Sequence, residues 1–315
     1  METIFGIDHL TRQLVNPVVT LGNFDGVHLG HQKIFQKVKS EASKIGGESV
    51  VITFEPHPLK VLAAQSCPPL LTPLRTKTLL IERSGMDILL CIEFTKIFSE
   101  LSPHDFVKAV LVEKVGARKV IVGYNYHFGK KKQGNPQTLK QIGSLFNIQV
   151  EVVEPLTIEG ITVSSSKIRD MIKKGRLEQA SKFLGRHYSI FGKVIEGAKR
   201  GQSLLGFPTA NLEISDELYP FPGVYAVEVL WRGQSFQGVA NVGSSPTFQA
   251  GEGKILLEVH LLGFHEGIYG EEIQVDFIRR IRDEARFDSV AQLITQIQKD
   301  VEWARENVFK TKAPS

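Results

Sequence analysis

The segment at positions 22–31, GNFDGVHLGH, contains residue types that can bind a nucleotide phosphate. It joins an apolar run at 18–21, which predicts a strand, to a predicted helix. In an open parallel sheet, ligands bind at the carboxyl ends of strands, and the free N–H groups of the following helix suit phosphate. Gly22 allows close backbone approach. His28 and His31 share a face of the first helical turn, where imidazoles can stabilise charge developing on a phosphoryl group.

Two other interpretations of this histidine pair stay open on composition alone. The pair can be part of a metal site, although neither a cysteine nor a further acidic ligand completes a typical zinc set. It can also belong to an ordinary satisfied turn. The spacing of the segment differs from a Walker A loop, which disfavours P-loop ATPase chemistry.

A second group of chemically useful residues stands at positions 201–212, GQSLLGFPTANL. Thr209 and Asn211 are two residues apart, so on a strand they point the same way and can reach one hard cation such as the Mg²⁺ that accompanies ATP. Gly192, Gly197 and Gly201 can let the backbone fold over phosphates. By composition alone, an ordinary turn followed by an edge strand is the favoured interpretation of this segment.

The first half of the chain alternates predicted strands and helices, which indicates a parallel sheet covered on both faces. The predicted strands lie at 18–21, 50–54, 87–94, 119–122 and 148–153, and the predicted helices at 31–45, 102–115, from 135, 165–174 and 177–184. This arrangement would place the segment at 22–31 at the carboxyl edge of the sheet.

After Gly185 the pattern changes to strands without helices between them, which predicts an antiparallel barrel or sandwich. The predicted strands lie at 188–195, 223–231, 235–242, 255–264 and 271–281, with a hairpin turn at 232–234. A closing helix with an apolar face from Val290 to Val308 is expected to pack on the barrel. We therefore predict two domains, residues 1–185 and 186–315.

Composition is ordinary for a globular protein: 315 residues, 42% hydrophobic, 23% charged and a formal net charge of +4. No stretch has the length of a membrane span, and the N-terminus lacks the apolar core of a secretory signal. We expect a cytoplasmic protein with two reduced cysteines, Cys67 and Cys91. The small, dispersed basic excess predicts no nucleic-acid partner.

The motifs of the first half resemble those of the FAD synthetase part of bacterial bifunctional riboflavin kinase/FAD synthetases. Besides H-x-G-H at 28–31, the similar blocks are TFEPHP at 53–58, LTP at 71–73, 94–106, GYNYHFG at 123–129 and VSSSKIR at 163–169. The resemblance implies a Rossmann-like nucleotidyltransferase domain that transfers AMP from ATP to FMN, giving FAD and pyrophosphate.

This resemblance also implies roles for individual residues. His28 and His31 would contact the ATP phosphates and stabilise the transition state. The ATP site would be formed by Gly22, Asn23, Phe24, His28, His31, Asn125, Ser164, Ser165 and Arg169, and the flavin side by His57, Pro58, Tyr126 and Phe128. The sequence departs from the family pattern at Tyr126, where Phe is usual, and at Ser166–Lys167, where Thr–Arg is usual.

The second half resembles riboflavin kinases through GFPTAN at 206–211, followed by similar blocks at 223–225, 238–243, 246–248 and 258–262. The implied reaction is transfer of the ATP γ-phosphate to the riboflavin 5′-hydroxyl, with Glu258 as general base. The implied site residues are Gly192, Gly197, Gly201, Gly206, Thr209 and Asn211 for Mg²⁺·ATP, with Thr209 and Asn211 at the metal, and Gly223 and Tyr225 for the flavin.

The expected partners are thus riboflavin, FMN and ATP, with Mg²⁺ bound to ATP as the cofactor. Two alternatives accompany this hypothesis: an enzyme with only one active module, and a flavin-binding regulator without catalysis. A pure binding protein would not need a base such as Glu258, which favours the enzyme. The sequence does not define an oligomeric state.

Overall fold

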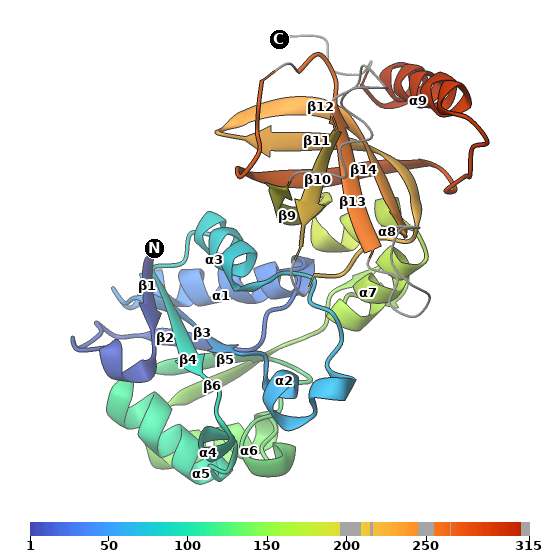
Figure 1. Cartoon of the computed structure of the whole chain (residues 1–315). Helices are drawn as coiled ribbons and strands as arrows, with labels where there is room; N and C mark the ends of the chain where they lie inside the picture. The colour runs from blue at the N-terminus through green and yellow to red at the C-terminus, as the bar shows by residue number, and fades with distance from the viewer. Residues whose placement is uncertain (196–208, 215–216, 245–254, 265, 310–315) are drawn as a thin grey trace. The chain divides into compact units, whose positions relative to one another are not determined.

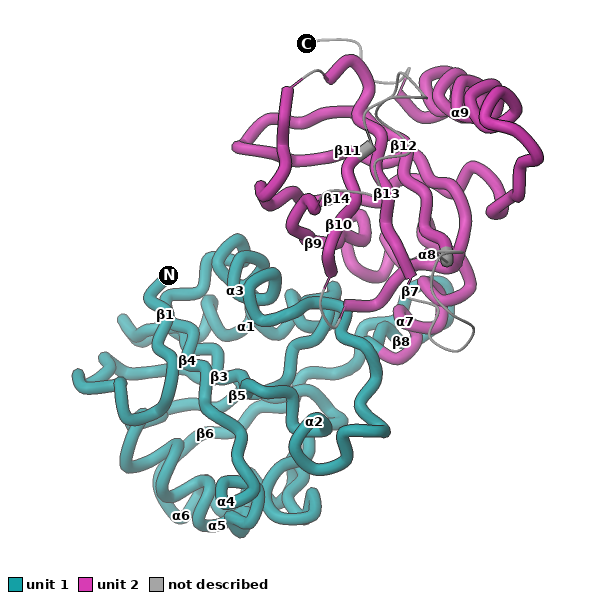
Figure 2. Tube along the Cα trace, viewed as in Figure 1, with its two compact units in different colours: residues 1–165 teal, residues 166–315 magenta. Residues whose placement is uncertain are grey.

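The computed structural model describes residues 1–195, 209–214, 217–244, 255–264 and 266–309. The chain divides into two compact units, Met1–Ser165 and Ser166–Ser315 (Figures 1 and 2). This division places the segment between residues 166 and 185 with the second unit. The predicted domain limits, 1–185 and 186–315, stay a prediction.

The first unit is built on a six-stranded parallel sheet in the order β1-β4-β3-β2-β5-β6. The strands are β1 (Glu2–Phe5), β2 (Val18–Leu21), β3 (Ser49–Glu55), β4 (Ile88–Glu93), β5 (Lys119–Gly123) and β6 (Gln149–Val153). The chain leaves β2 toward β3 and later returns to its other side with β5. The switch point of the sheet therefore lies at β2, and ligands of such sheets bind there.

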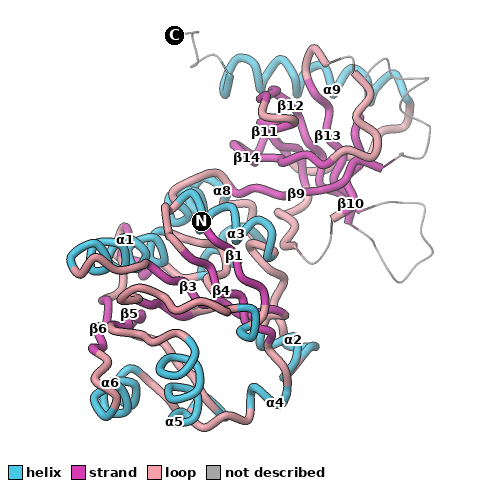
Figure 3. Tube along the Cα trace, turned by 90° about the vertical axis from the view of Figure 1, so that its left-hand side faces the viewer, coloured by secondary structure: helices cyan, strands magenta, loops and turns pink. Residues whose placement is uncertain are grey.

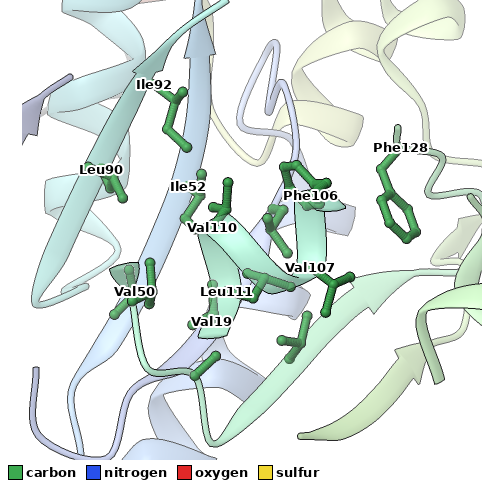
Figure 4. Packing of buried hydrophobic residues seen from close by; sticks show 14 of the residues in the cluster. Val19, Val50, Ile52, Leu90, Ile92, Phe106, Val107, Val110, Leu111 and Phe128 are labelled. Atoms are coloured by element: carbon green, nitrogen blue, oxygen red, sulfur yellow. The ribbon is translucent and has the colours of Figure 1, made fainter. Parts of the chain in front are cut away.

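Helices cover both faces of this sheet, as the alternating pattern predicted (Figures 1 and 3). On one face, α1 (Leu29–Lys44) and α3 (Leu74–Arg83) pack through Phe35, Val38 and Ile81. On the other face, α5 (Pro103–Phe106) continues directly into the π-helical segment η3 (Val107–Lys114), and α6 (Pro136–Leu145) lies beside them. Figure 4 shows this second core, where side chains of η3 meet those of the central strands.

The remaining short elements of this unit connect the sheet. They are η1 (Ile7–His9), α2 (Pro58–Leu62), η2 (Ala64–Ser66), α4 (Lys96–Ser99), η4 (Lys130–Lys132) and the β7–β8 hairpin (Thr157–Ile158 and Ile161–Thr162). Ser102 caps the helix predicted at 102–115, because its hydroxyl accepts the Asp105 N–H at 3.1 Å. Sequence reasoning missed β1 and α3.

The second unit contains α7 (Ser165–Lys173, whose first residue belongs to the first unit), α8 (Leu177–Leu184) and a closed antiparallel barrel in the order β10-β13-β12-β11-β14-β9. Its strands are β9 (Tyr188–Ile195), β10 (Thr209–Glu213), β11 (Gly223–Trp231), β12 (Gln234–Ser244), β13 (Ile255–Leu261) and β14 (Glu272–Arg282). The predicted hairpin is confirmed: Arg232 and Gly233 have φ of 47° and 79°, which matches a two-residue turn.

The closing helix α9 (Val290–Ala304), extended by η5 (Arg305–Phe309), packs on the outside of the barrel (Figure 3). Val301 and Ala304 meet Val224, Ala226 and Val239. Asp300 is 3% exposed and accepts three hydrogen bonds from the Arg282 guanidinium, at 2.7–3.1 Å. This ion pair fixes the helix to the end of β14.

No helix within the described residues is long and apolar enough to cross a membrane.

Candidate active sites

The loop between β2 and α1 brings the two predicted histidines together. His28 is the N-cap of α1, and its Nδ1 accepts the His31 backbone N–H at 3.3 Å. The two imidazole rings stack, with centroids 3.5 Å apart and planes 19° apart. An accepting Nδ1 leaves the proton of a neutral His28 on Nε2, so that nitrogen is a donor for a ligand at the helix N-terminus.

Phe24 supports this loop from inside. Its ring is 4% exposed and lies edge-on to His31, with centroids 5.2 Å apart, and against Phe35. Phe24 and Val27 adopt positive φ values of 46° and 39°, a conformation that is uncommon for non-glycine residues and least expected for the β-branched Val27. A Cβ on Gly22 would lie 3.1 Å from the Phe24 ring, so the glycine lets the loop close over it.

Two further predicted residues meet at the neighbouring strand end. Asn23 follows β2, His57 follows β3, and the Asn23 amide lies 3.2 Å from His57 Nε2. His57 is 7% exposed, and its Nδ1 accepts the Leu59 N–H, which caps α2 at Pro58. An accepting Nδ1 places the proton of a neutral His57 on Nε2, and a hydrogen bond to Asn23 then requires the amide group to be turned so that its oxygen faces this nitrogen.

The start of α7 lies beside the same loop. The Ser165 hydroxyl donates to the Asp25 carbonyl oxygen at 2.9 Å, and Ser164 precedes it in the chain. Arg169 stands four residues further along α7, in the second unit. Sequence reasoning gave Asp25 no role, because its burial, which indicates a specific partner, is visible only in the structure.

The predicted flavin side is formed after β5. Asn125 is exposed and lies over Gly123, the last residue of β5. The Tyr126 and Phe128 rings are parallel, with centroids 5.6 Å apart. The Tyr126 hydroxyl is enclosed and makes no hydrogen bond within the described part of the chain, and burial raises the pKa of Tyr126 well above its usual range. The departure from Phe thus adds an unsatisfied hydroxyl to the core.

In the barrel, strand register aligns the predicted kinase residues. Glu258 of β13 is directly opposite Asn211 of β10 on one side and Asn241 of β12 on the other. Directly opposite residues of antiparallel strands point to the same face. Val224, paired with Asn241, packs against α9, so this row lies on the outer face of the barrel.

The environment of Glu258 favours its protonated form. Burial raises the pKa of Glu258, and the negative charge of Glu284 raises it further. The Glu284 carboxylate lies over Gly243, two residues from Asn241 on β12; a Cβ there would be 2.1 Å from its oxygen. A general base with a raised pKa holds an abstracted proton more effectively near neutral pH.

Of the other predicted kinase residues, some lie within barrel strands, one is in the core, and three are outside the part of the chain that the structure describes. Gly192 lies within β9, where a Cβ would be 2.7 Å from the Leu212 side chain. The backbone of Thr209 pairs with that of His260. Tyr225 is fully buried, donates to the Phe221 carbonyl oxygen and packs against Phe277. A Cβ on Gly223 would be 2.6 Å from the Arg282 carbonyl oxygen. Gly197, Gly201 and Gly206 lie outside the described residues.

A nucleotide-binding sheet followed by a barrel with a strand-bound carboxylate defines a two-part, nucleotide-dependent transferase. The sequence profile of the FAD synthetase family matches residues 11–167, and that of the riboflavin kinase family matches residues 184–308. Both predicted modules are therefore present, in the predicted order.

Full-length relatives agree. Proteins named bifunctional riboflavin kinase/FMN adenylyltransferase from Buchnera aphidicola (subspecies Schizaphis graminum) and Haemophilus influenzae are 39% and 36% identical to this chain. The matches cover 96% and 97% of this chain, and 97% and 98% of the relatives. The chain belongs to the bifunctional riboflavin kinase/FMN adenylyltransferase family. The predicted family, two-part fold and enzyme class are thereby confirmed.

A solved structure from Streptococcus pneumoniae, described as a macrolide-efflux protein, is also similar to this chain. It is 32% identical with a TM-score of 0.85, and the match covers 97% of this chain and 99% of that one. This likeness supports the same succession of elements.

Proposed function

We propose that the barrel phosphorylates riboflavin to FMN and that the sheet-edge site adenylylates FMN to FAD, each with ATP. The observation that carries this proposal is the stacked His28–His31 pair at the N-terminus of α1, at the switch point of a parallel sheet. Its placement suits a triphosphate, and the family membership supplies the two acceptors.

In adenylyl transfer, an FMN phosphate oxygen attacks the α-phosphorus of ATP. The new P–O bond forms as the bond to the leaving pyrophosphate breaks. His28 Nε2 and His31 donate hydrogen bonds to charge that grows on the phosphoryl oxygens, and the first N–H groups of α1 add to this stabilisation. By analogy with the family, Ser164, Ser165 and Arg169 would contact the phosphates. Tyr126 and Phe128 would form the surface on which the flavin lies.

In the kinase reaction, Glu258 accepts the proton of the riboflavin 5′-hydroxyl as its oxygen attacks the γ-phosphorus, and ADP leaves. Asn211 lies on the same face of the barrel as Glu258, so an amide oxygen and a carboxylate converge where phosphates would bind. Such oxygen donors fit Mg²⁺, and Thr209 and Asn211 would hold it. When bound with ATP, the ion neutralises phosphate charge, and positioning does the rest.

We also propose a cytoplasmic location. Cys67 and Cys91 are both free thiols, which suits a reducing compartment.

A product assay tests the proposed function directly. The full chain is incubated with riboflavin, Mg²⁺ and ATP, and flavins are separated by chromatography. We expect FMN to form first and FAD to follow. FMN without FAD, even when FMN is supplied, would limit the activity to the barrel; the absence of both products would favour a flavin-binding regulator.

A further inference from the structure

A buried lysine on α3 has no side-chain partner among the residues that the structure describes. Lys77 is 4% exposed, and its side-chain ammonium makes no hydrogen bond or ion pair within the described residues. The Nζ atom of Lys77 is not fully enclosed by protein and so keeps some contact with solvent. Burying an ammonium group is unfavourable unless negative charge compensates it.

The helix position adds to this cost. Lys77 is the fourth residue of α3, and its backbone N–H donates to the Pro73 carbonyl oxygen at 2.9 Å. The positive end of the helix dipole disfavours a cation in the first turn. Lys77 also shares the buried face of α3 with Ile81, which belongs to the core. A hydrophobic residue would therefore stabilise this position more simply.

The position of α3 and its electrostatics both point to the carboxyl edge of the sheet, because α3 begins two residues after Thr72, which Asp25 binds. Burial lowers the pKa of Lys77, while the charges of Asp25 and Glu55 oppose that shift. Asp25 follows β2, and Glu55 ends β3. The charge of Lys77 also acts on the pKa of Cys91 in β4, where it opposes the larger effect of burial. A helix that connects parallel strands begins at this edge, which agrees with a position in the first turn of α3.

Asp25 joins the nucleotide loop to the segment before α3. Its carboxylate is 4% exposed and accepts the Leu71 and Thr72 N–H groups, each at 3.0 Å. The Thr72 hydroxyl in turn accepts the Gly26 N–H at 2.8 Å. With the bond from Ser165, these contacts bind three segments that are far apart in the sequence around the loop that carries His28.

We propose that Lys77 is a positioning residue for adenylyl transfer, whose buried ammonium offsets the charge of Asp25 and so keeps the His28–His31 loop in its working geometry. This inference rests on the proposed function of that loop. Lys77 itself touches no reacting group. It acts through Asp25, and displacement of a catalytic group by about 1 Å can lower a rate about 10²-fold.

The test is a double-mutant cycle on the full chain with Lys77→Met and Asp25→Asn, each alone and combined. FAD formation from supplied FMN is measured as kcat and KM for ATP, and FMN formation from riboflavin is the internal reference. We expect Lys77→Met to lower kcat/KM for FAD formation at least 10-fold, with FMN formation within 2-fold of wild type. Lys77→Arg, which keeps the cation, should recover part of that loss.

The cycle separates an action through Asp25 from an independent one. In the Asp25→Asn background, which has no charge to offset, Lys77→Met should have a much smaller additional effect. An equal loss in both backgrounds would overturn the inference, as would a lower melting temperature with unchanged kcat and KM. If Lys77→Met does not fold, the double variant should fold; its failure would also overturn the inference.

The matched control is Lys108→Met, at a lysine of the same unit whose side chain is 54% exposed; it should leave both activities unchanged. A wild-type chain that makes no FAD from FMN and ATP would overturn the proposed function itself. Wild-type FAD formation that Lys77→Met leaves intact would overturn only the role of Lys77.

Discussion

The two candidate sites of this molecule are held together in different ways. At the sheet edge, the residues around His28 come from separate loops and helix ends and are joined by side-chain hydrogen bonds, chiefly those of Asp25. In the barrel, Asn211, Glu258 and Asn241 are aligned by the register of adjacent strands. The geometry of a site built from loops depends on side chains that can be distant from the reacting groups. The geometry of a site on adjacent strands depends on the backbone hydrogen bonds between those strands.

This difference predicts separable activities, and the largest effects are expected for the two proposed catalytic groups, beginning with His28→Ala. The change removes a donor to the transferred phosphoryl group and the N-cap of α1. FAD formation should fall by about 10²–10³-fold or more, while FMN formation continues. Chromatographic assays of both products measure this. His104→Ala, at a half-exposed histidine of the same unit, is the control. Parallel loss of both activities in a folded variant would contradict two independent sites.

The converse change is Glu258→Gln in the barrel. It keeps the shape of the side chain but removes the base, so the kcat of FMN formation should fall by about 10²–10⁴-fold. FAD formation from supplied FMN should be unchanged. Glu266→Gln, at an exposed glutamate of the same unit, is the matched control. Kinase turnover that survives in Glu258→Gln would remove Glu258 as the base.

A pH-dependent effect on stability is expected for the barrel through Glu217. This residue is 7% exposed, and burial raises the pKa of Glu217 to about 8, although its carboxylate accepts the Phe191 N–H at 3.3 Å. A raised folded-state pKa means that the stabilising contribution is complete below the unfolded value, near 4.5, and is lost as the pH rises toward 8.

Glu217→Gln removes that dependence. At pH 8 its melting temperature should exceed that of wild type, by an amount on the order of 5 °C, and the difference should shrink toward pH 5. Calorimetry of the full chain across this range measures it. A difference in melting temperature that is the same at every pH would show that the pKa of Glu217 does not differ between the folded and unfolded states.

The smallest effect is expected in the first unit. Tyr126→Phe removes the enclosed, unbonded hydroxyl and should raise the free energy of unfolding of that unit by about 1–2 kcal/mol. Denaturant titration measures this, and FAD formation should persist because the ring remains. Tyr124→Phe, at a tyrosine that is 45% exposed, should change little. A loss of stability in Tyr126→Phe would reveal a bonded hydroxyl.

Much of this fold could be predicted from local sequence patterns. The strand–helix alternation before residue 185 and the strand spacing after it predicted the sheet and the barrel, because hydrophobic period and turn residues are local properties. The edge strand β1 and the helix α3 were missed. In α3 the buried face consists of Thr76, Lys77 and Ile81, so polar residues interrupt the apolar periodicity that would have marked it.

Roles of single residues were harder to infer. Asp25 lies within the segment 22–31, yet only its hydrogen bonds to residues 71 and 72 show that it joins this loop to the segment before α3. Tyr225 was predicted to bind flavin, and the structure places its ring inside the barrel. A motif states which residues stand together in the chain, but burial depends on neighbours that are distant in the sequence.

The amino-acid sequence by itself determined the two-module plan, the histidine pair with its three-residue spacing and the family to which both halves belong, since each is written in short stretches of chain. Only the tertiary structure decided that Asn23 meets His57, that Asn211 and Asn241 flank Glu258, and that the charge of Asp25 acts on the buried Lys77. Those pairings join residues separated by about 17–50 positions, and only packing and strand register bring such residues into contact.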